Sequence, residues 1–289
     1  WDFSSGDLHV TGWHADDASI FAPYHYLIVF DRSANRQVSS QRIKNIASPD
    51  VAKVFGSDTR TAGDARFDVD LGKLPLQMGH TYSIVSRYSD VSTGNGNSSD
   101  SVDYWLPDFT LNQSGYHFDS VNVEGDRITV GGWFASDAAT TKDNRFVILL
   151  INGKEVARQK IQATARPDVA KVYPQMYNSA NSGFVTAFDL PNNVTDHNGS
   201  FQVVLRYSDA NDGEGNYVDA WSEKYNNKVL YTNRLIVSNG KFYYLDGNGQ
   251  IVRNQTINVN GIDLHFNNDG AADTDLDTLR TFTGNQLAA

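Results

Sequence analysis

Two loops of the sequence carry oxygen-bearing side chains at spacings that suit a hard cation. Asp209 and Asn211 alternate with other residues ahead of a pair of glycines, and Asp273 and Asp275 alternate in the same way near the C-terminal end. Alternating carboxylate and amide oxygens are typical of the start of a calcium-binding loop. The glutamate that closes an EF-hand loop is missing, and the same residue types also favour Asx turns. Calcium is therefore the one candidate cofactor, with purely structural turns as the alternative.

A second candidate site is a run of aromatic side chains in the C-terminal part of the chain. Phe242, Tyr243 and Tyr244 are consecutive, and Phe266 belongs to a related segment further on. Flat aromatic surfaces bind the apolar face of sugar rings by stacking. One face of this strand-like segment has to be more exposed than the other, so the run predicts carbohydrate binding. Packing between hairpins would use the same residues and is the alternative.

The remaining chemistry-bearing residues form no recognisable catalytic motif. The seven histidines show no metal-ligand spacing, and the sequence contains neither a Gly-x-Ser-x-Gly nucleophile elbow nor a phosphate-binding loop. Pairs of carboxylates recur in loops that are repeated along the chain, which suits a structural role better than acid–base catalysis. We therefore predict that this chain is not itself an enzyme.

The sharpest motif in the sequence is Arg166-Pro167-Asp168-Val169-Ala170-Lys171-Val172, which has an earlier twin at 48–54 with Ser48 in place of Arg166. The surroundings match as well: Gly-Trp occurs at 12–13 and 132–133, and Arg-Tyr-Ser at 87–89 and 206–208. Matched segments in the same order indicate an internal repeat. We therefore predict two copies of one domain, at residues 1–107 and 117–225, joined by a linker at 106–115.

Each copy reads as a series of short strands with one short helix. Alternating apolar residues predict strands at 7–13 and 127–133, and Asn152-Gly153 predicts a tight hairpin. Proline at the first helical position predicts helices at 49–55 and 167–173. The expected fold is mainly β, with two tandem β-sandwich (Ig-like) repeats. Matched tryptophans are expected in the cores, namely Trp13, Trp105, Trp133 and Trp221. Arg206 is expected to pair with Asp168 or with a loop carbonyl and so to fix the helix to the sheet.

The character of the chain changes at 226–289. The segment at 261–270 repeats the pattern of residues 240–249 after 21 positions. Each segment is a predicted strand with an aromatic residue, followed by an Asp/Asn-Gly turn. This pattern predicts one β-hairpin per repeat, in an array that two copies alone would not complete. The chain begins with Trp within a strand-like pattern, so we expect it to be a piece of a longer protein.

Charge and cysteine content exclude several classes of partner. The chain has 289 residues, a formal net charge of −10 and no cysteine. Nucleic acid and anionic membrane surfaces are therefore poor partners, and disulfides and zinc–thiolate sites are excluded. The apolar runs have the length of strands, and none is long enough for a membrane-spanning helix.

The spaced set Arg166-Pro167-Asp168-Val169, Ser182-Gly183-Phe184 and Arg206-Tyr207-Ser208 resembles the Arg-Asp-Val repeat of lactobacillar glucansucrases, glycoside hydrolase family 70. The first copy keeps Pro-Asp-Val and Arg-Tyr-Ser but lacks the leading Arg and the Ser-Gly. Residues 240–249 resemble the glucan-binding and choline-type cell-wall repeats. The repeat-defining residues in the second copy, to which we assign a structural role, are Arg166, Pro167, Asp168, Val169, Phe184 and Arg206.

The resemblance implies an N-terminal variable region of an extracellular glucansucrase, a sucrose- or glucan-acting glycosyltransferase whose catalytic domain would follow as a C-terminal partner. The leading hypothesis is a non-catalytic region that binds α-glucan or cell-wall polysaccharide, or that holds the enzyme at the cell surface. One alternative is a structural spacer without a ligand. The other is a wall-binding module of a peptidoglycan hydrolase.

Overall fold

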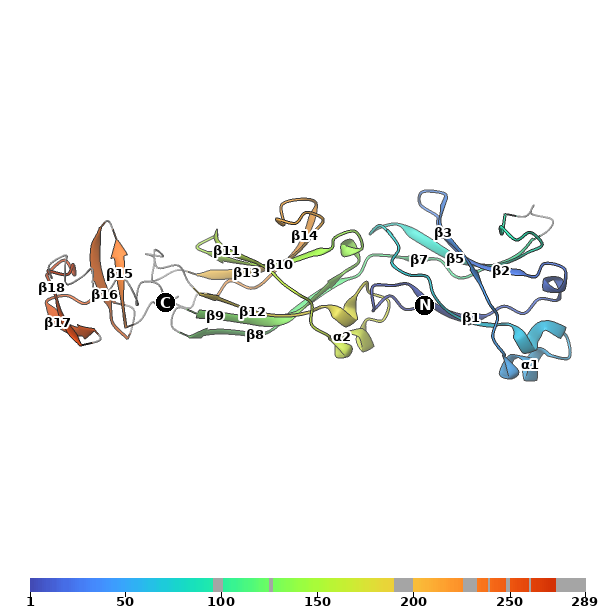
Figure 1. The fold of residues 1–289 in the computed structure, drawn as a ribbon, viewed down its shortest axis with the longest axis horizontal. Helices are drawn as coiled ribbons and strands as arrows, with labels where there is room; N and C mark the ends of the chain where they lie inside the picture. Colours follow the sequence, from blue (N-terminus) through green and yellow to red (C-terminus); the bar gives the residue numbers. More distant parts are fainter. Residues whose placement is uncertain are drawn as a thin grey trace.

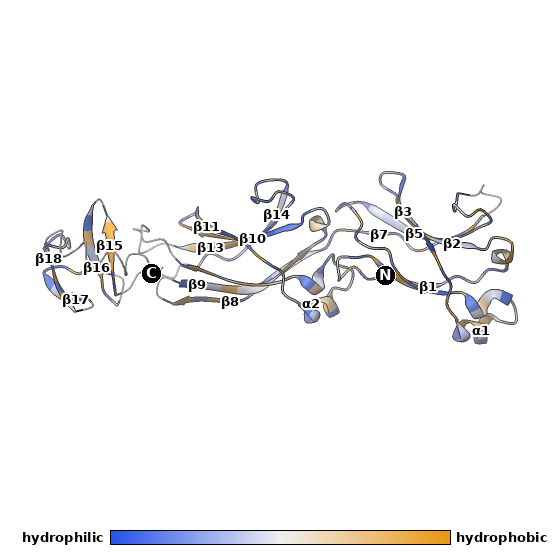
Figure 2. Cartoon of the chain, in the orientation of Figure 1, coloured by the Kyte–Doolittle hydropathy of each residue, from blue (hydrophilic) through white to orange (hydrophobic). Residues whose placement is uncertain are grey.

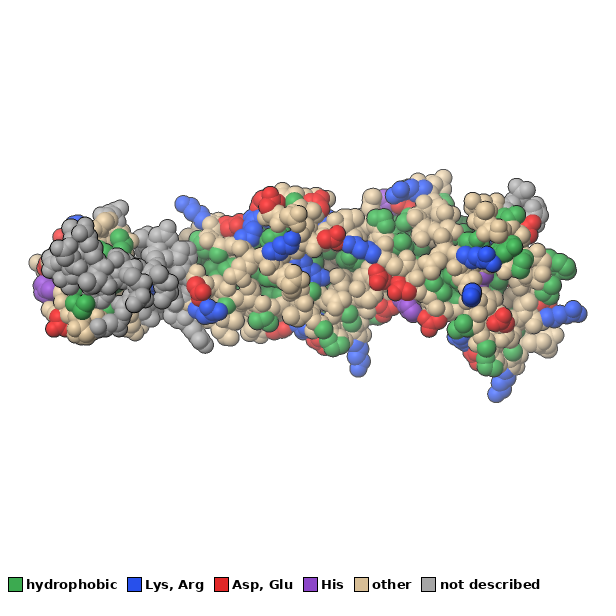
Figure 3. Space-filling view, in the orientation of Figure 1, with side chains coloured by type: hydrophobic (Ala, Val, Ile, Leu, Met, Phe, Trp, Pro, Cys, Tyr) green, Lys and Arg blue, Asp and Glu red, His purple; other side chains and the backbone are tan. Residues whose placement is uncertain are grey.

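The computed structural model describes residues 1–95, 101–124, 127–189, 200–225, 233–238, 240–247, 250–259 and 261–273. The described chain is mainly β, and the elements follow one another along the long axis of an elongated molecule (Figure 1). The space-filling view in Figure 3 shows positive and negative side chains interspersed along the visible face. Two β-sandwiches come first and two β-hairpins follow. The predicted fold class is therefore confirmed.

The first sandwich packs a two-stranded sheet on a larger antiparallel sheet. The small sheet pairs β1 (His9–Trp13) with β4 (Arg66–Asp70). The larger sheet has the order β3 (Arg36–Ile43), β2 (Tyr24–Asp31), β5 (Thr81–Ser89) and β6 (Ser101–Trp105), and β7 (Phe109–Thr110) also pairs with β5. The connections contain η1 (Asp17–Ile20), α1 (Pro49–Phe55) and η2 (Arg60–Asp64). Alternate residues of β1 and β2 point between the sheets, so that Val10 and Leu27 share one core.

The second sandwich has the same plan, with one more strand in its smaller sheet and one fewer in its larger sheet. Its smaller sheet has the order β12 (Gly183–Asp189), β9 (Arg127–Ser136) and β8 (Ser114–Glu124). Its larger sheet has the order β11 (Lys154–Lys160), β10 (Asn144–Ile151), β13 (Phe201–Ser208) and β14 (Tyr217–Trp221). The connections contain η3 (Asp137–Ala139), α2 (Pro167–Val172) and η4 (Ser179–Asn181). Asn152 and Gly153 turn β10 into β11 with φ values of 51° and 76°, as the Asn-Gly pair predicted.

The predicted linker is wrong, because the segment between the sandwiches is packed. Phe109 and Thr110 form β7 against β5, and Leu111 is buried in the hydrophobic core. β8 begins directly afterwards, at Ser114, and had not been predicted as a strand. The two sandwiches are therefore not separate domains on a free tether.

The first residues of the chain join the two sandwiches. The Phe3 N–H donates to Pro174 O at 2.8 Å, and the Asn178 N–H donates to Phe3 O at 2.9 Å. The Phe3 ring packs edge-on against Tyr177 with 5.0 Å between ring centroids. The Thr140 hydroxyl donates to Leu76 O across the same junction. One hydrophobic core therefore runs through both sandwiches, and Figure 1 shows the N-terminus beside α2.

The tail forms two hairpins, as predicted, but the position of their turns differs. The turn of each hairpin precedes the aromatic strand, whereas the sequence predicted a turn after it. β15 (Arg234–Ser238) pairs with β16 (Lys241–Leu245), and β17 (Gln255–Val259) pairs with β18 (Ile262–Phe266). Each aromatic strand thus pairs with the segment before it. The later turns bring Ile251 opposite Leu245 and Ala272 opposite Phe266 as isolated bridges. Apolar residues stand out on β13 and β15 (Figure 2).

Candidate functional site

The first sandwich contains a group of polar side chains between its sheets. His14 directly follows β1, His25 lies at the start of β2, and Ser86 and Tyr88 lie on β5. The antiparallel register places His25 opposite Tyr88, and Ser86 two residues earlier on the same strand. Successive side chains of a strand point to opposite faces, so Ser86 and Tyr88 share the face toward β1. We call His14, His25, Asn45, Ser86 and Tyr88 the polar cluster.

Hydrogen bonds link every member of the polar cluster. Ser86 Oγ lies 2.9 Å from His14 Nδ1 and 2.7 Å from His25 Nε2. His25 Nδ1 lies 2.5 Å from Asn45 Oδ1, which can only accept, so Nδ1 carries the proton and Nε2 accepts from Ser86.

The cluster is closed by Asn45 and Tyr88. The Asn45 amide donates to Tyr88 Oη at 2.9 Å and to Asp64 O at 2.7 Å. Tyr88 Oη in turn donates to His14 O at 2.8 Å. Each buried polar atom thus has a partner, which fixes the side chains in one arrangement.

Burial keeps both imidazoles of the polar cluster neutral. It lowers the pKa of His25 to about 4, while the hydrogen bond to Asn45 opposes this effect and the charge of His14 adds to it. Burial also lowers the pKa of His14, against the attraction of Asp16 and Asp103. The pKa of the Tyr88 phenol is raised by burial. At neutral pH the cluster therefore carries no charge.

Ser86, His25 and Asn45 have the connectivity of a nucleophile, a base and an orienting group. The surroundings oppose such a role. Ser86 is only 1% exposed, and its oxygen is held between two imidazoles, which leaves no direction for a substrate carbonyl. A base with a pKa near 4 also abstracts a proton weakly at neutral pH. The cluster therefore serves to hold side chains in place.

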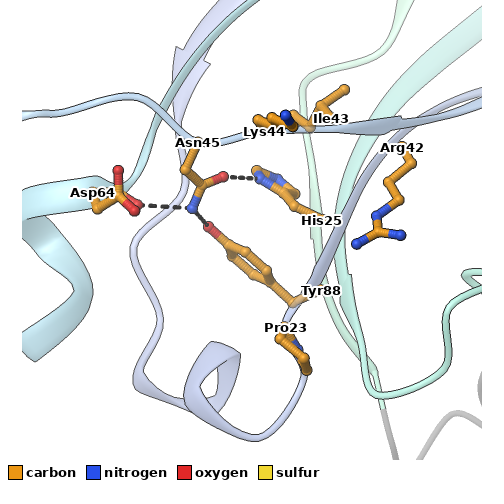
Figure 4. Close-up of a pocket in the computed structure, with 8 residues that line it drawn as sticks. All are labelled: Pro23, His25, Arg42, Ile43, Lys44, Asn45, Asp64 and Tyr88. Carbon is orange, nitrogen blue, oxygen red and sulfur yellow. Dashed lines mark hydrogen bonds between the residues drawn. The ribbon is translucent and has the colours of Figure 1, made fainter.

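A hollow of about 600 Å³ opens beside the polar cluster. Figure 4 shows Asn45 in its centre, between His25, Tyr88 and Asp64, with Arg42 on the adjoining strand. Arg42, Lys44 and Asp64 are exposed, and they add two positive charges and one negative charge to the lining. The Arg42 guanidinium lies 4.5 Å from the centroid of the Tyr24 ring. The full lining consists of Pro23, His25, Arg42, Ile43, Lys44, Asn45, Asp64 and Tyr88.

The same place in the second sandwich holds an arginine instead of a histidine. Arg145 stands opposite Tyr207 on β10 and β13, as His25 stands opposite Tyr88. Its guanidinium lies 4.9 Å from the centroid of the Tyr207 ring and donates to Asn181 O. Arg145 and Tyr207 line two smaller hollows, one of about 10 Å³ between the sheets and one of about 250 Å³ toward Lys73. The longer arginine side chain therefore narrows the space beside the tyrosine in the second copy, which the shorter histidine leaves wide in the first.

The expectation that the matched tryptophans are core residues is wrong for three of them. Trp13, Trp105 and Trp221 are 44%, 40% and 46% exposed. Trp13 packs on Phe55 of α1 with 5.3 Å between ring centroids, and Arg32 lies 4.3 Å over Trp105. These three rings therefore lie on the surface, and Phe55 and Arg32 cover one face of Trp13 and Trp105.

The three candidate calcium ligands within the described residues make other contacts. Asp209 Oδ1 accepts the Asn216 N–H at 2.9 Å, and Asn211 Oδ1 accepts from Lys160 Nζ at 3.1 Å. Asp273 accepts from the Asn267 amide at 3.1 Å, and Asp275 lies outside the described residues. Within the described ranges no group of three or more acidic or histidine side chains could hold a metal ion. The geometry at Asp209 is that of a closed turn.

The glycine-bearing loops cover the outer faces of the larger sheets. Gly213, with φ of 83°, lies against the Phe146 ring, and Gly94, with φ of 75°, lies against Tyr26. A Cβ would lie 2.9 Å from the Tyr26 ring at Gly94 and 3.1 Å from the Phe146 ring at Gly213, so glycine permits this close approach of the loops. Their function in the structure is to cover aromatic side chains.

The aromatic run of the tail is divided between core and surface. Phe242, Tyr243 and Tyr244 are half-buried on β16. Phe266 is fully buried in the small core of the hairpins, 6.0 Å from the Tyr244 ring. A sugar ring cannot reach Phe266 in this arrangement, so the prediction that Phe266 binds carbohydrate is wrong.

The repeat-defining residues make structural contacts, but not all of the expected ones. Arg206 makes two hydrogen bonds to Asp219, at 2.7 and 2.8 Å, and one to Gly213 O at 3.1 Å. The predicted loop carbonyl is thus correct, whereas the predicted pairing with Asp168 is wrong. Asp168 is held instead by Arg166, which lowers the pKa of its carboxyl to about 2.

The remaining repeat-defining residues surround α2. Arg166 also donates to Asp119 of β8 at 2.6 Å. Pro167 is the first residue of α2, and Val169 and Phe184 are buried. The motif therefore clamps the helix to the smaller sheet.

The polar cluster was missed because no local motif marks it. Its members come from four separate segments of the chain, and only the fold brings them together. A signal was nevertheless present in the repeat. His14, His25 and Ser86 stand where the second copy has Phe134, Arg145 and Leu205. Polar residues at positions that are apolar or filled in the other copy could have indicated a site in the first copy.

Comparisons with known proteins add no function. Neither a protein family model nor a curated protein matches the sequence. Among solved structures, a crystal structure of a DUF3823 family protein from Bacteroides ovatus ATCC 8483 is similar over 75% of this chain and 97% of that chain. Its sequence identity is 13% and its TM-score is 0.26, which is too low for an argument. In the described part of the chain, no helix has the length and apolar character needed to cross a membrane.

Proposed function

We propose that this chain is a non-catalytic, polysaccharide-binding region of an extracellular glucansucrase-like enzyme, and that the hollow beside the polar cluster receives the saccharide. The resemblance of the repeat and of the tail supports the parent enzyme and the extracellular location. The ligand class is α-glucan or cell-wall polysaccharide. The volume and the polar lining of the hollow support the binding role.

The groups around the hollow suit a ligand rich in hydroxyls. Each sugar hydroxyl both donates and accepts hydrogen bonds, and Arg42 and Lys44 supply donors while Asp64 supplies an acceptor. Tyr24, half-buried beside Arg42, adds an aromatic face at the rim. The volume of about 600 Å³ is in the range of small-ligand sites.

The polar cluster makes the floor of the hollow rigid. Asn45 is fixed through three hydrogen bonds, to His25, Tyr88 and Asp64 O. A floor that is already ordered loses little conformational entropy when a ligand binds. The single observation that carries the proposal is the contrast between the copies, since the first has a hollow of about 600 Å³ at this place and the second has hollows of about 10 and 250 Å³ around Arg145.

Affinity electrophoresis in gels that contain dextran, another α-glucan or purified cell wall tests the proposal. We expect the wild-type chain to be retarded in at least one of these gels. The double substitution Arg42→Ala with Lys44→Ala should lower the affinity at least tenfold, because both charged donors at the rim are lost. Replacement His25→Arg, which copies the second sandwich, should have the same effect by filling the hollow.

The matched control is the double substitution Lys154→Ala with Lys171→Ala. It also removes two exposed cations, but on the second sandwich and away from the hollow. Retardation should persist in this variant. Absence of retardation of the wild type in all gels, or equal loss in both double variants, would refute the proposal. Retardation by wall alone would favour the wall-binding module of a hydrolase.

A structural spacer is the second candidate, and one observation favours it. The two sandwiches share a continuous core and follow one another along an elongated molecule. Such a rod would hold a catalytic domain at a distance from a surface whether or not a ligand binds.

A further inference from the structure

The outer edge of β1 is open where the matching edge of β9 is paired. β9 lies between β12 and β8, whereas β1 pairs with β4 on one side only. Within residues 1–95, the other side of β1 bears a single bridge, between Asp2 and His9. The strands match closely, since Gly12 lies opposite Phe67 as Gly132 lies opposite Phe184.

The Asp2–His9 bridge has the register of β8 on β9. In the second sandwich Asn122 lies opposite Thr129, and both residues stand 120 positions after Asp2 and His9. Trp1 therefore takes the place of Val121. The part of β8 from Ser114 to Ser120, which covers the rest of β9, has no counterpart among the described residues.

The backbone of β1 presents hydrogen-bonding groups at this edge. His9 both donates to Asp2 O and accepts from the Asp2 N–H, at 2.9 Å each. Alternate residues of a strand bond to the same side, so Thr11 and Trp13 direct their N–H and C=O groups to the open edge. Both residues are exposed, whereas Gly131, the counterpart of Thr11, is buried under β8.

A second hollow, of about 500 Å³, lies along the same edge and is lined by Gly12, Trp13, His14 and Tyr104 among others. In the second sandwich Phe118 lies opposite Gly132 and Tyr116 lies opposite Phe134. Gly132 and Phe134 of β9 correspond to Gly12 and His14 in the first sandwich. The hollow is therefore where the aromatic side chains of a strand like β8 would lie.

Trp13 and Asp17 also lack the cover that their counterparts have. A Cβ added at Gly115 would lie 3.1 Å from the Trp133 ring, so the β8 backbone covers that ring. Asp137 is fully buried and accepts the N–H groups of Gln113 and Tyr177, at 2.8 and 2.9 Å. Asp17 is half-buried and accepts the Thr61 N–H at 3.1 Å.

We infer that the outer edge of β1 is an acceptor site for one extended polypeptide segment, which is joined directly to Trp1 and has the side-chain pattern of residues 114–120. The segment adds antiparallel to β1, with a small residue over Trp13 and two aromatic side chains in the hollow. This is strand addition to an exposed sheet edge. The Phe67 ring, which now lies over Gly12, turns aside as the strand approaches.

The chain provides its own test segment. A copy of residues 111–120 fused directly to Trp1 continues the β8 register without a gap. We expect hydrogen exchange of the Thr11 and Trp13 amides to slow at least about 100-fold, because these groups become paired inside a sheet. Fluorescence of Trp13 should shift to shorter wavelength. The β8–β9 amides of the second sandwich serve as the folded reference in the same sample.

The control is an equally long fusion that carries Tyr116→Asp and Phe118→Asp in the copied segment only. Its charged side chains cannot enter the hollow, so the slowing at Thr11 and Trp13 should be lost while the reference amides stay protected. Unchanged exchange of the two amides in the first fusion would overturn the inference. Equal slowing of exchange in both fusions would overturn the claim that two aromatic side chains of the added segment are needed in the hollow.

Discussion

At the scale of single residues, the two copies differ at the positions of the polar cluster, where the second copy has apolar residues or an arginine. His14, His25 and Ser86 replace Phe, Arg and Leu of the second copy, and Asn45 replaces Ala163. These changes act together, because each new polar atom is satisfied by another member of the cluster. A single change would have left a buried polar group without a partner, which destabilises a fold.

The first prediction concerns the pH dependence of stability. The pKa of His25 is lowered to about 4 in the folded chain from 6.5, so the unfolded chain takes up the proton at a higher pH. The contribution of neutral His25 to the free energy of unfolding is therefore complete above about pH 6.5. It is lost as the pH falls from 6.5 toward 4, by on the order of 3 kcal/mol. Urea denaturation between pH 7 and pH 4 measures it.

The variant His25→Gln serves as the control for that titration, because it cannot ionise. Its free energy of unfolding should fall less steeply over the same pH range than that of the wild type. An identical slope in both proteins would contradict a buried neutral imidazole.

The sequence predicted part of the residue-scale chemistry. The structural role of Arg206 and its bond to a loop carbonyl follow from a long cation on an alternating strand beside a glycine loop. The candidate calcium and aromatic sites failed in part because side-chain type does not reveal hydrogen-bond partners or burial. Asn211 contacts Lys160, and Phe266 is in a core, through contacts that only the fold creates.

At the scale of elements, glycine permits the close contact between β8 and β9. A Cβ at Gly132 would lie 2.1 Å from His117 O and 3.0 Å from Phe118 Cα, and both atoms belong to the backbone of β8. Backbone atoms in a paired strand cannot move aside as a flexible side chain can.

We predict that Gly132→Ala displaces β8 and lowers the free energy of unfolding by about 3 kcal/mol. Thermal and urea denaturation measure the loss. Gly63→Ala is the matched control, because its nearest neighbour is the Ala52 Cβ at 3.9 Å. The control should be close to neutral, and equal losses in the two variants would show that β8 is not held as described.

The helices were predictable from sequence, whereas β8 was not. Proline at the first helical position and a short apolar pattern define α1 and α2 locally, and both occur within the predicted ranges. β8 escaped detection because the first copy offers only Asp2 as a paired equivalent, so the comparison of repeats contained no second example. The tail hairpins were predicted with the wrong turn because a turn stands on each side of the aromatic strand, and the sequence alone does not show which one forms the hairpin.

At the scale of the whole molecule, the junction couples the two sandwiches. Phe3 is fully buried and contacts Tyr177, and Lys73 pairs with Asp143 across the same boundary. The linker prediction failed because the short segment at 106–111 does not itself reveal the strand with which it pairs. Its burial depends on non-local contacts with the first sandwich, where β7 pairs with β5 and Phe109 packs on Tyr82.

We predict that the two sandwiches unfold in one calorimetric transition in the wild type. Phe3→Ala should cost about 3 to 5 kcal/mol and should separate the transition into two, because the lost ring belongs to the interface. Phe188→Ala, in the core of the second sandwich away from Phe3, should destabilise without that separation. Two independent transitions in the wild type would contradict a shared core.

The course of β8 has a mechanical consequence. The strand starts at the junction and runs antiparallel to β9 along the second sandwich. Hydrogen bonds between antiparallel strands lie perpendicular to the chain direction. A pull on the segment that leads into Ser114 therefore loads the bonds between β8 and β9 in shear, and they share the force instead of opening one after another. The second sandwich is thus arranged to resist tension applied along the length of the molecule.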